Sequence, residues 1–200
     1  MKHRNAILSF AAVLTLAACA TVPPQSQQLA ANFKAMQPTS GLAKEMTLEE
    51  AERIRDGLVA ELAASHGKVV GYKAGLTNPA VQKRFGTTSP VRGVLLEKML
   101  LDDGAEVPAK FGAIPFFEAD IVAVVKDEGI NQAKTPAEVM KHVASVRPFL
   151  ELPDLVTAKE QPLTGAIITS FNVGARLGVL GKPIAPTPEM ADALGKMTVV

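Results

Sequence analysis

Residues 47 to 66 carry the clearest helical pattern of this chain. Thr47-Leu48-Glu49-Glu50 forms a capping box, in which the N-cap Thr and the Glu three residues later satisfy each other's backbone N–H groups. Apolar residues then recur at helical spacing on one face, at Ile54, Leu58, Val59 and Leu62. The pattern predicts a helix from Thr47 to about Ser65.

From residue 67 onward, short apolar stretches alternate with helical ones. A second capping box, Thr135-Pro136-Ala137-Glu138, predicts a helix continuing through Val139, Val143 and Val146, and Asn78-Pro79 predicts a short helix ending at Gly86. Asp102-Asp103-Gly104 is typical of a hairpin turn. Strands are predicted at 68–74, 91–96, 114–125, 148–152, 165–171, 175–180 and 196–200. Because strands and helices are mixed and no Gly-rich phosphate loop occurs, the predicted fold class is α+β.

The N-terminus has the pattern of an export signal. A basic segment, Met1 to Asn5, precedes an apolar run from Ala6 to Ala18, which is shorter than the roughly 20 residues that span a bilayer. The run ends in Leu16-Ala17-Ala18-Cys19, which resembles the lipobox of bacterial lipoproteins. That resemblance implies a signal peptide over 1–19, a lipidated Cys19 and a membrane anchor on the periplasmic face of the outer membrane. The alternatives are an ordinary signal peptide with an incidental Cys, or a cytoplasmic protein if the signal is unused.

Residues 20–46 are rich in Pro, Gln, Ser and Ala and are predicted to be a tether, with a short helix near Gln28 to Met36. The remaining residues, 47–200, are predicted to form one domain. Its net charge of +1 and lack of a Lys/Arg cluster argue against nucleic acid as a partner. Cys19 is the only cysteine, so neither a disulfide nor a thiolate nucleophile is expected.

Two carboxylates interrupt the apolar stretch Ile114 to Val125. Glu118 and Asp120 are two residues apart, so on a strand both point to the same face. Such a pair repels and is costly to bury unless a cation lies between, and oxygen ligands suit Mg²⁺, Mn²⁺ or Ca²⁺. The alternative is a solvated strand face. The opposite face is predicted to pack in the core, with Phe117, Ala119, Ile121 and Ala123.

Two more charged residues have unusual surroundings. Glu151 lies among apolar residues in Phe149-Leu150-Glu151-Leu152-Pro153, where pairing with Arg147 is the alternative to metal binding. Lys73 precedes a Gly turn in Gly71-Tyr72-Lys73-Ala74-Gly75, where a ligand can approach the backbone, and the alternative is a surface lysine. The three histidines form no Ser–His or Cys–His pair at suggestive positions, so triad hydrolase chemistry is not expected.

Several of these segments together resemble a known family. The stretch from Gly71 to Asn78 (GYKAGLTN) is similar to the GYKxGLTs signature of the 2-keto-4-pentenoate hydratases, in the fumarylacetoacetate hydrolase superfamily. Phe117 to Ile121 resembles their metal-binding ExE strand, and Glu151 falls where that family places its third metal carboxylate. Ser170 to Gly181 resembles their DNxxxG…G segment. The similarity runs in matching order from about Lys68 to the last residue.

The resemblance implies a mixed β-sandwich roll and a divalent metal, Mg²⁺ or Mn²⁺, held by Glu118, Asp120 and Glu151. It assigns Lys73 a role as proton donor or substrate-carboxylate contact, and it adds Leu76 and Asn172 as substrate contacts. The implied substrate is a small 2-keto or 2-hydroxy-dienoic acid, and the implied reaction is hydration. The family also tends to form homo-oligomers.

Two departures from the family pattern keep other functions open. Asp120 replaces the usual Glu, and the family's last strands are absent, so we expect a domain incomplete at its C-terminus and poorly stable over residues 20–200. Decarboxylases and C–C hydrolases of 2-oxo acids in the same superfamily are the nearest alternatives. A periplasmic binding lipoprotein without turnover is a third.

Overall fold

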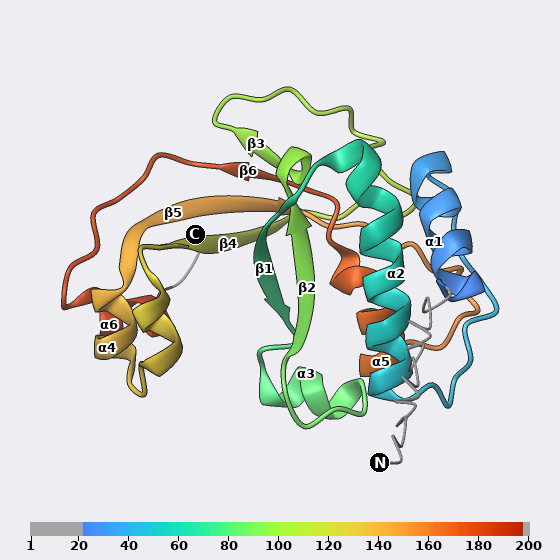
Figure 1. Cartoon of the computed structure of the whole chain (residues 1–200), viewed down its shortest axis with the longest axis horizontal. Helices are drawn as coiled ribbons and strands as arrows, with labels where there is room; N and C mark the ends of the chain where they lie inside the picture. Colours follow the sequence, from blue (N-terminus) through green and yellow to red (C-terminus); the bar gives the residue numbers. More distant parts are fainter. Residues whose placement is uncertain (1–21, 198–200) are drawn as a thin grey trace, which may run out of the picture.

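The computed structural model describes residues 22–197, which form two small sheets flanked by helices (Figure 1). The helices are α1 (Pro24–Ala35), α2 (Leu48–His66), α3 (Pro79–Arg84), α4 (Pro136–Lys141), α5 (Gly165–Ser170) and α6 (Met190–Ala193). The strands are β1 (Val69–Gly75), β2 (Val91–Leu96), β3 (Leu100–Asp102), β4 (Glu118–Val125), β5 (Val143–Leu152) and β6 (Leu177–Leu180). Short 3-10 helices lie at Glu97–Met99, Glu128–Gln132, Asn172–Gly174 and Leu194–Lys196.

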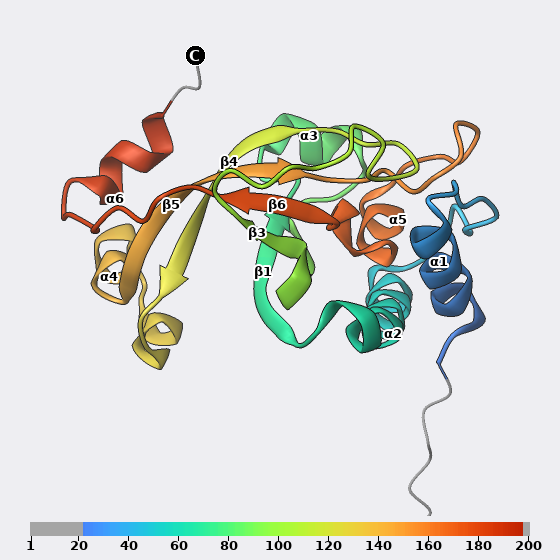
Figure 2. The ribbon, with the colours of Figure 1, turned by 90° about the horizontal axis from the view of Figure 1, so that it is seen from above.

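The strands divide into a two-stranded and a four-stranded sheet. β1 pairs with β2 in antiparallel fashion, and the larger sheet has the order β3-β6-β5-β4, with β3 parallel to β6 and the other pairs antiparallel. Figure 2 shows the long β4–β5 ribbon extending away from α1 and α2 toward α4 and α6. This mixture of helices and strands confirms the predicted α+β class.

The helix predicted from Thr47 is confirmed, and its capping box is formed. The Thr47 Oγ1 accepts the N–H of Glu50 at 3.2 Å, and the Glu50 carboxylate accepts the N–H of Thr47 at 2.8 Å. The helix buries Ile54, Leu58, Val59 and Leu62 against α1, α5 and β2. This contact is the centre of the main hydrophobic core.

The second capping box also begins a helix, but the prediction for its end was wrong. α4 ends at Lys141, and Val143 and Val146 belong to β5 instead. Val146 pairs with Ala123 and Val143 with Val125 on β4. Valine is β-branched and suits a strand, so pairing with β4 overrides a helical spacing that arose by coincidence.

Three other element predictions need correction. Residues 165–170 form α5 rather than a strand, because Thr164 caps a helix there, and a largely buried run without polar-apolar alternation does not identify a strand. The turn after Asp102 is present, but β3 pairs with the distant β6, so it closes no hairpin. Lys196 lies in a 3-10 helix, and residues 198–200 are outside the described part.

The short helix predicted near Gln28 to Met36 is present as α1, but it packs on the core instead of belonging to a free tether. α1 packs on α2 and buries Leu29, Ala30 and Phe33, and the N–H of Leu42 donates to Gln161 at 3.0 Å. The Arg176 guanidinium lies 4.2 Å from the centre of the Phe33 ring. Pro and Gln at the start of the helix hid this apolar face in the sequence. The predicted signal peptide and Cys19 lie outside the described residues.

The predicted core face of β4 was also wrong. Phe117 is 78% exposed, and Ala119 and Ala123 are exposed as well. β4 is the edge strand of its sheet, and neither of its faces is covered along its whole length. Among residues 22–197, no helix is long and apolar enough to cross a membrane.

Two phenylalanines test these corrections. Phe33→Ala should lower the free energy of unfolding by about 3–5 kcal/mol, because Phe33 is buried and contacts Arg176. Phe117→Ala, the matched control, should change it by less than about 0.5 kcal/mol, since its ring is exposed. Denaturant unfolding measures both, and equal effects would contradict the assignment of residues 24–35 to the core.

Candidate functional site

Lys73 and Glu151 meet where the two sheets approach each other. The Lys73 Nζ donates to the Glu151 carboxylate and to the backbone oxygen of Val173, the latter at 2.9 Å. Lys73 comes from β1 and Glu151 from β5, so the contact joins the two sheets. Both side chains are largely buried, with exposed fractions of 13% and 7%. The pairing predicted as an alternative, Glu151 with Arg147, is not formed; the Arg147 Nε donates to the backbone oxygen of Gly181.

A glycine on β2 makes room for the Lys73 side chain. Gly93 pairs directly with Lys73, and a Cβ at Gly93 would lie 2.8 Å from the Lys73 Cγ and 2.8 Å from the Asn172 backbone oxygen. Contacts that short do not occur in folded proteins, so any side chain at this position would displace Lys73. Sequence analysis missed Gly93, because a glycine inside a strand shows a close approach only once its neighbours are known.

The segment that accepts the second Lys73 bond has an unusual backbone. Asn172, Val173 and Gly174 have φ values of 61°, 54° and 69°. This region disfavours β-branched residues, so Val173 is strained. The Asn172 amide holds the segment by accepting the Val94 N–H at 2.7 Å and donating to the Val94 oxygen at 2.8 Å.

Asn172 and Leu76 were predicted as substrate contacts. The Asn172 side chain is buried, and its amide group is used by the Val94 backbone, so its observed role is to join the 172–174 segment to β2. Leu76 follows β1 directly and has a φ of 54°, and its backbone oxygen accepts from the Gln82 side chain at 2.9 Å. Its half-buried side chain packs on the core. For both residues a substrate contact stays a prediction.

The three predicted metal ligands share one face of the β4–β5 ribbon. Glu118 pairs directly with Glu151, and Asp120 lies two residues further along β4. Glu118 and Asp120 are exposed, while Glu151 is buried. Burial raises the pKa of Glu151 above its ordinary value, the Lys73 ammonium opposes this, and the negative charges of Glu118 and Asp120 add to the increase. Like charges in direct cross-strand positions are unfavourable without a cation.

The carboxylate oxygens themselves do not converge. Across residues 22–197, no three His, Cys, Asp or Glu side chains form a group that could hold a metal ion. Glu151 is turned to Lys73, and the Asp120 Oδ1 accepts the N–H of Ile121 at 2.7 Å. The donor set consists of oxygens only, and within residues 22–197 no Lys, Arg or His forms an ion pair with Glu118 or Asp120, so its chemistry fits a divalent ion such as Mg²⁺.

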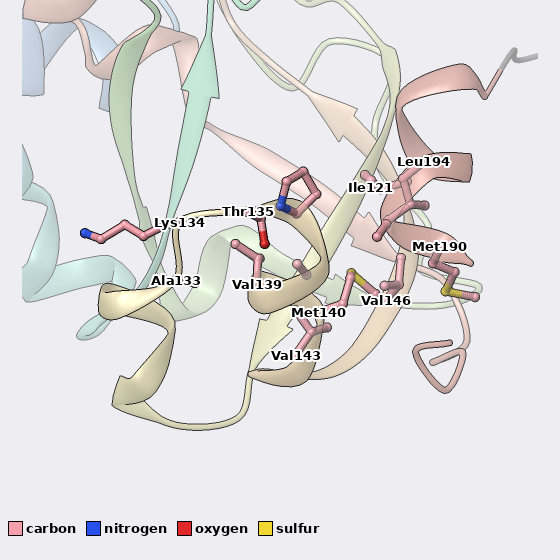
Figure 3. Close-up of a pocket in the computed structure, with 13 residues that line it drawn as sticks. Ile121, Ala133, Lys134, Thr135, Val139, Met140, Val143, Val146, Met190 and Leu194 are labelled. Carbon is pink, nitrogen blue, oxygen red and sulfur yellow. The ribbon is translucent and has the colours of Figure 1, made fainter. Parts of the chain in front are cut away.

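An apolar cavity lies elsewhere in the described residues. A cavity of about 490 Å³ forms between the β4–β5 ribbon and α4 and α6, and Figure 3 shows its lining. Ile121 and Ala123 line it from β4, and these residues point to the face opposite Glu118 and Asp120. The lining is almost wholly apolar and contains neither Lys73 nor the three carboxylates. The charged cluster therefore remains the candidate site.

The chain is similar in sequence to several hydratases and similar in fold to a decarboxylase. No known family profile matches the chain. It is 34% identical over 87 residues to a 2-keto-4-pentenoate hydratase of Burkholderia vietnamiensis, covering 44% of this chain and 33% of that protein. It is 28% identical over 148 residues to a 2-oxo-hept-4-ene-1,7-dioate hydratase of Escherichia coli, covering 71% and 55%. The chain thus spans one third to just over half the length of these relatives.

The fold is that of a solved decarboxylase. The structure of 4-oxalocrotonate decarboxylase from Pseudomonas putida G7, complexed with magnesium and adipate, superposes with a TM-score of 0.69 at 20% identity, covering 80% of this chain and 62% of that one. A second structure of that enzyme, complexed with calcium and acetate, gives 0.68 at 22% identity. The predicted fold class is therefore confirmed.

Replacing Lys73 should change how stability depends on pH. Lys73→Met removes the cation beside Glu151, so the pKa of that buried carboxyl rises further. A carboxyl whose folded pKa lies above its unfolded value contributes stability below the unfolded pKa and loses it as pH rises through the folded one. The variant should therefore lose about 3–5 kcal/mol at neutral pH and clearly less near pH 5.

Urea unfolding at the two pH values measures this difference. Lys68→Met is the matched control, because Lys68 is exposed and immediately precedes β1. It should show no such pH dependence. Equal losses at both pH values in Lys73→Met would contradict the buried pair.

Proposed function

We propose that this chain is a metal-dependent hydratase of the 2-keto-4-pentenoate hydratase type. Its substrate would be a small 2-hydroxy-dienoic or 2-keto acid such as 2-keto-4-pentenoate. One observation carries the proposal: the fold brings the lysine of the GYKAGLT motif onto Glu151, directly opposite Glu118. The sequence similarity to hydratases supports the same reaction.

Glu118, Asp120 and Glu151 are the residues that would hold the Mg²⁺ or Mn²⁺. When bound, the metal supplies Lewis acidity that stabilises the enolate charge of a 2-oxo acid. Glu118 and Asp120 are exposed to solvent, while Glu151 is buried and forms an ion pair with Lys73. The Asp120 side chain is one methylene shorter than Glu, which places its oxygen about 1.5 Å further back, a single C–C bond length.

Lys73 is the residue that would act on the substrate. Its Nζ carries protons beside the carboxylate cluster and is oriented by the Val173 oxygen at 2.9 Å. An ammonium there can bind the substrate carboxylate, or it can give a proton to the substrate carbon as the enol becomes a ketone. Water then adds across the remaining double bond. Its oxygen bonds to the carbon farther from the new ketone, and its proton goes to the carbon nearer to the ketone.

Decarboxylation of a 2-oxo acid is the second candidate. The superposition on 4-oxalocrotonate decarboxylase favours it, because that enzyme has the same fold. Both reactions need stabilisation of an enolate. They differ because hydration adds water, whereas decarboxylation releases CO₂. Incubation with 2-hydroxypenta-2,4-dienoate and with 4-oxalocrotonate separates the two reactions, since only decarboxylation releases CO₂.

Metal binding gives the direct test of the site. Glu118→Gln should weaken Mn²⁺ binding by more than about 100-fold. Changing an outer-shell partner costs about 10–100-fold, and this variant removes one of the three proposed ligands themselves. Glu106→Gln is the control, since Glu106 is an exposed carboxylate of a loop before β4. Calorimetric titration and hydration of the dienoate, followed by its absorbance, measure the two effects. Unchanged affinity in Glu118→Gln would refute the ligand assignment.

We further propose that the chain is exported and anchored to the membrane through lipid on Cys19. The single cysteine at the lipobox position supports this. Cys19→Ser should abolish membrane association, whereas Thr21→Ser should not. Membrane fractionation and the mass of the mature N-terminus are the measurements, and an unmodified chain that begins elsewhere would exclude the anchor.

A further inference from the structure

Asp154 ends the segment that carries Glu151 and contacts the segment before β4. It is three residues after Glu151 and is 1% exposed. Its Oδ1 accepts the N–H of Ile114 at 2.8 Å, and its Oδ2 accepts the N–H of Ala113 at 3.0 Å. A Cβ at Gly112 would lie 2.5 Å from the Asp154 carboxyl carbon, so the loop backbone lies directly against the carboxylate.

These bonds continue the pairing of β4 with β5. Pro115 is three residues before Glu118 and bridges to Asp154, which is three residues after Glu151, so the bridge has the same register as the Glu118–Glu151 pair. The N–H of Phe116 donates to the Pro153 oxygen at 2.9 Å, and the N–H of Leu155 donates to the Ile114 oxygen at 3.1 Å.

Burial cannot select this register by itself. β4 is an edge strand, and Phe117, Val124 and Val125 are all more than a third exposed. A slip by one residue would move Glu118 and Asp120 to the other face of the ribbon, away from Glu151. Only Ile121 and Val122 of β4 are half-buried, so little apolar area opposes such a slip, and polar contacts are needed to fix the register.

A buried cation holds Asp154 in place. The Arg176 Nη1 donates to the Asp154 Oδ2 at 3.1 Å and to the Phe33 oxygen at 3.0 Å, and its Nε donates to the Phe111 oxygen. The Asp154 N–H also donates to the Gly174 oxygen at 2.9 Å, next to the Val173 oxygen that Lys73 contacts. Asp154, which lies just after β5, thus contacts the segment before β4 and the backbone of Gly174.

We infer that Asp154 is a positioning residue for the candidate metal site. Its carboxylate sets the register of β4 on β5, and so places Glu118 and Asp120 on the face that carries Glu151. The inference rests on the proposed function, because it concerns the same three carboxylates. The Asp154 carboxylate accepts from Ala113, Ile114 and Arg176, so its role would be to position the ligands and not to bind the metal.

Asp154→Asn should weaken Mn²⁺ binding by about 10–100-fold, the usual effect of an outer-shell change. The amide cannot accept from both Ala113 and Ile114, since one of its ends is a donor. Backbone amide hydrogen exchange from Ala119 to Val122 should become faster as well. Calorimetry and exchange measured by NMR give the two results on the full chain.

Two further variants separate positioning from general loss of stability. Gln161→Ala removes a buried side chain whose hydrogen bonds within residues 22–197 go to the backbone of Leu42 and Pro162, and it should leave Mn²⁺ affinity unchanged. The double variant Asp154→Asn with Arg176→Met removes the unpaired buried cation that the single change would leave. It should unfold at a higher denaturant concentration than Asp154→Asn and still bind Mn²⁺ weakly.

The outcomes are distinguishable. If Mn²⁺ binding is weakened in both Asp154 variants and not in Gln161→Ala, the positioning role holds. If the unaltered chain binds Mn²⁺ and the Asp154 variants bind it equally well, or no more weakly than Gln161→Ala, this inference is wrong and the proposed function stands. If the unaltered chain binds no Mn²⁺, the proposed function fails and this inference fails with it.

Discussion

The buried ion pair of Lys73 with Glu151 is the contact on which the candidate site depends. It joins β1 of the small sheet to β5 of the large one, and it leaves the Lys73 ammonium between the carboxylate and the Val173 oxygen. Buried pairs contribute little net stability, because desolvation cancels much of the attraction, yet losing one partner is costly. The pair is therefore better understood as a device of placement than as a source of stability, and the absent side chain at Gly93 makes it possible.

The second constraint is the register of β4. The strand lies at a sheet edge and is exposed for much of its length, so hydrophobic burial constrains its alignment weakly. The bonds of Asp154 to Ala113 and Ile114 continue the β4–β5 pairing past the carboxylates. A core determines the position of α2 and α5, whereas buried polar groups determine the position of the candidate ligands. This division explains how an exposed ribbon can present acidic groups in a defined order.

The wrong predictions have a common cause, which is that local patterns cannot show what packs against them. The run 165–171 is mostly apolar because α5 is buried against α2, and a short buried run of that kind is equally typical of a buried strand. Phe117 and Ala119 suggested a core face, but no element of residues 22–197 covers them enough to bury them. Phe33 was hidden in a polar segment, and its environment comes from Arg176, which is 143 residues away in the chain.

The sequence alone determined the features that depend on neighbouring residues. The capping boxes at Thr47 and Thr135 and the same-face placement of Glu118 and Asp120 follow from short-range geometry, and the order of motifs indicated the hydratase-like fold. Tertiary structure decided the rest. Only folding brings Lys73 to Glu151, 78 residues later in the chain, and only pairing places Glu118 opposite Glu151. Contacts between distant segments depend on strand register and on the space left by glycines such as Gly93, and no local pattern encodes either.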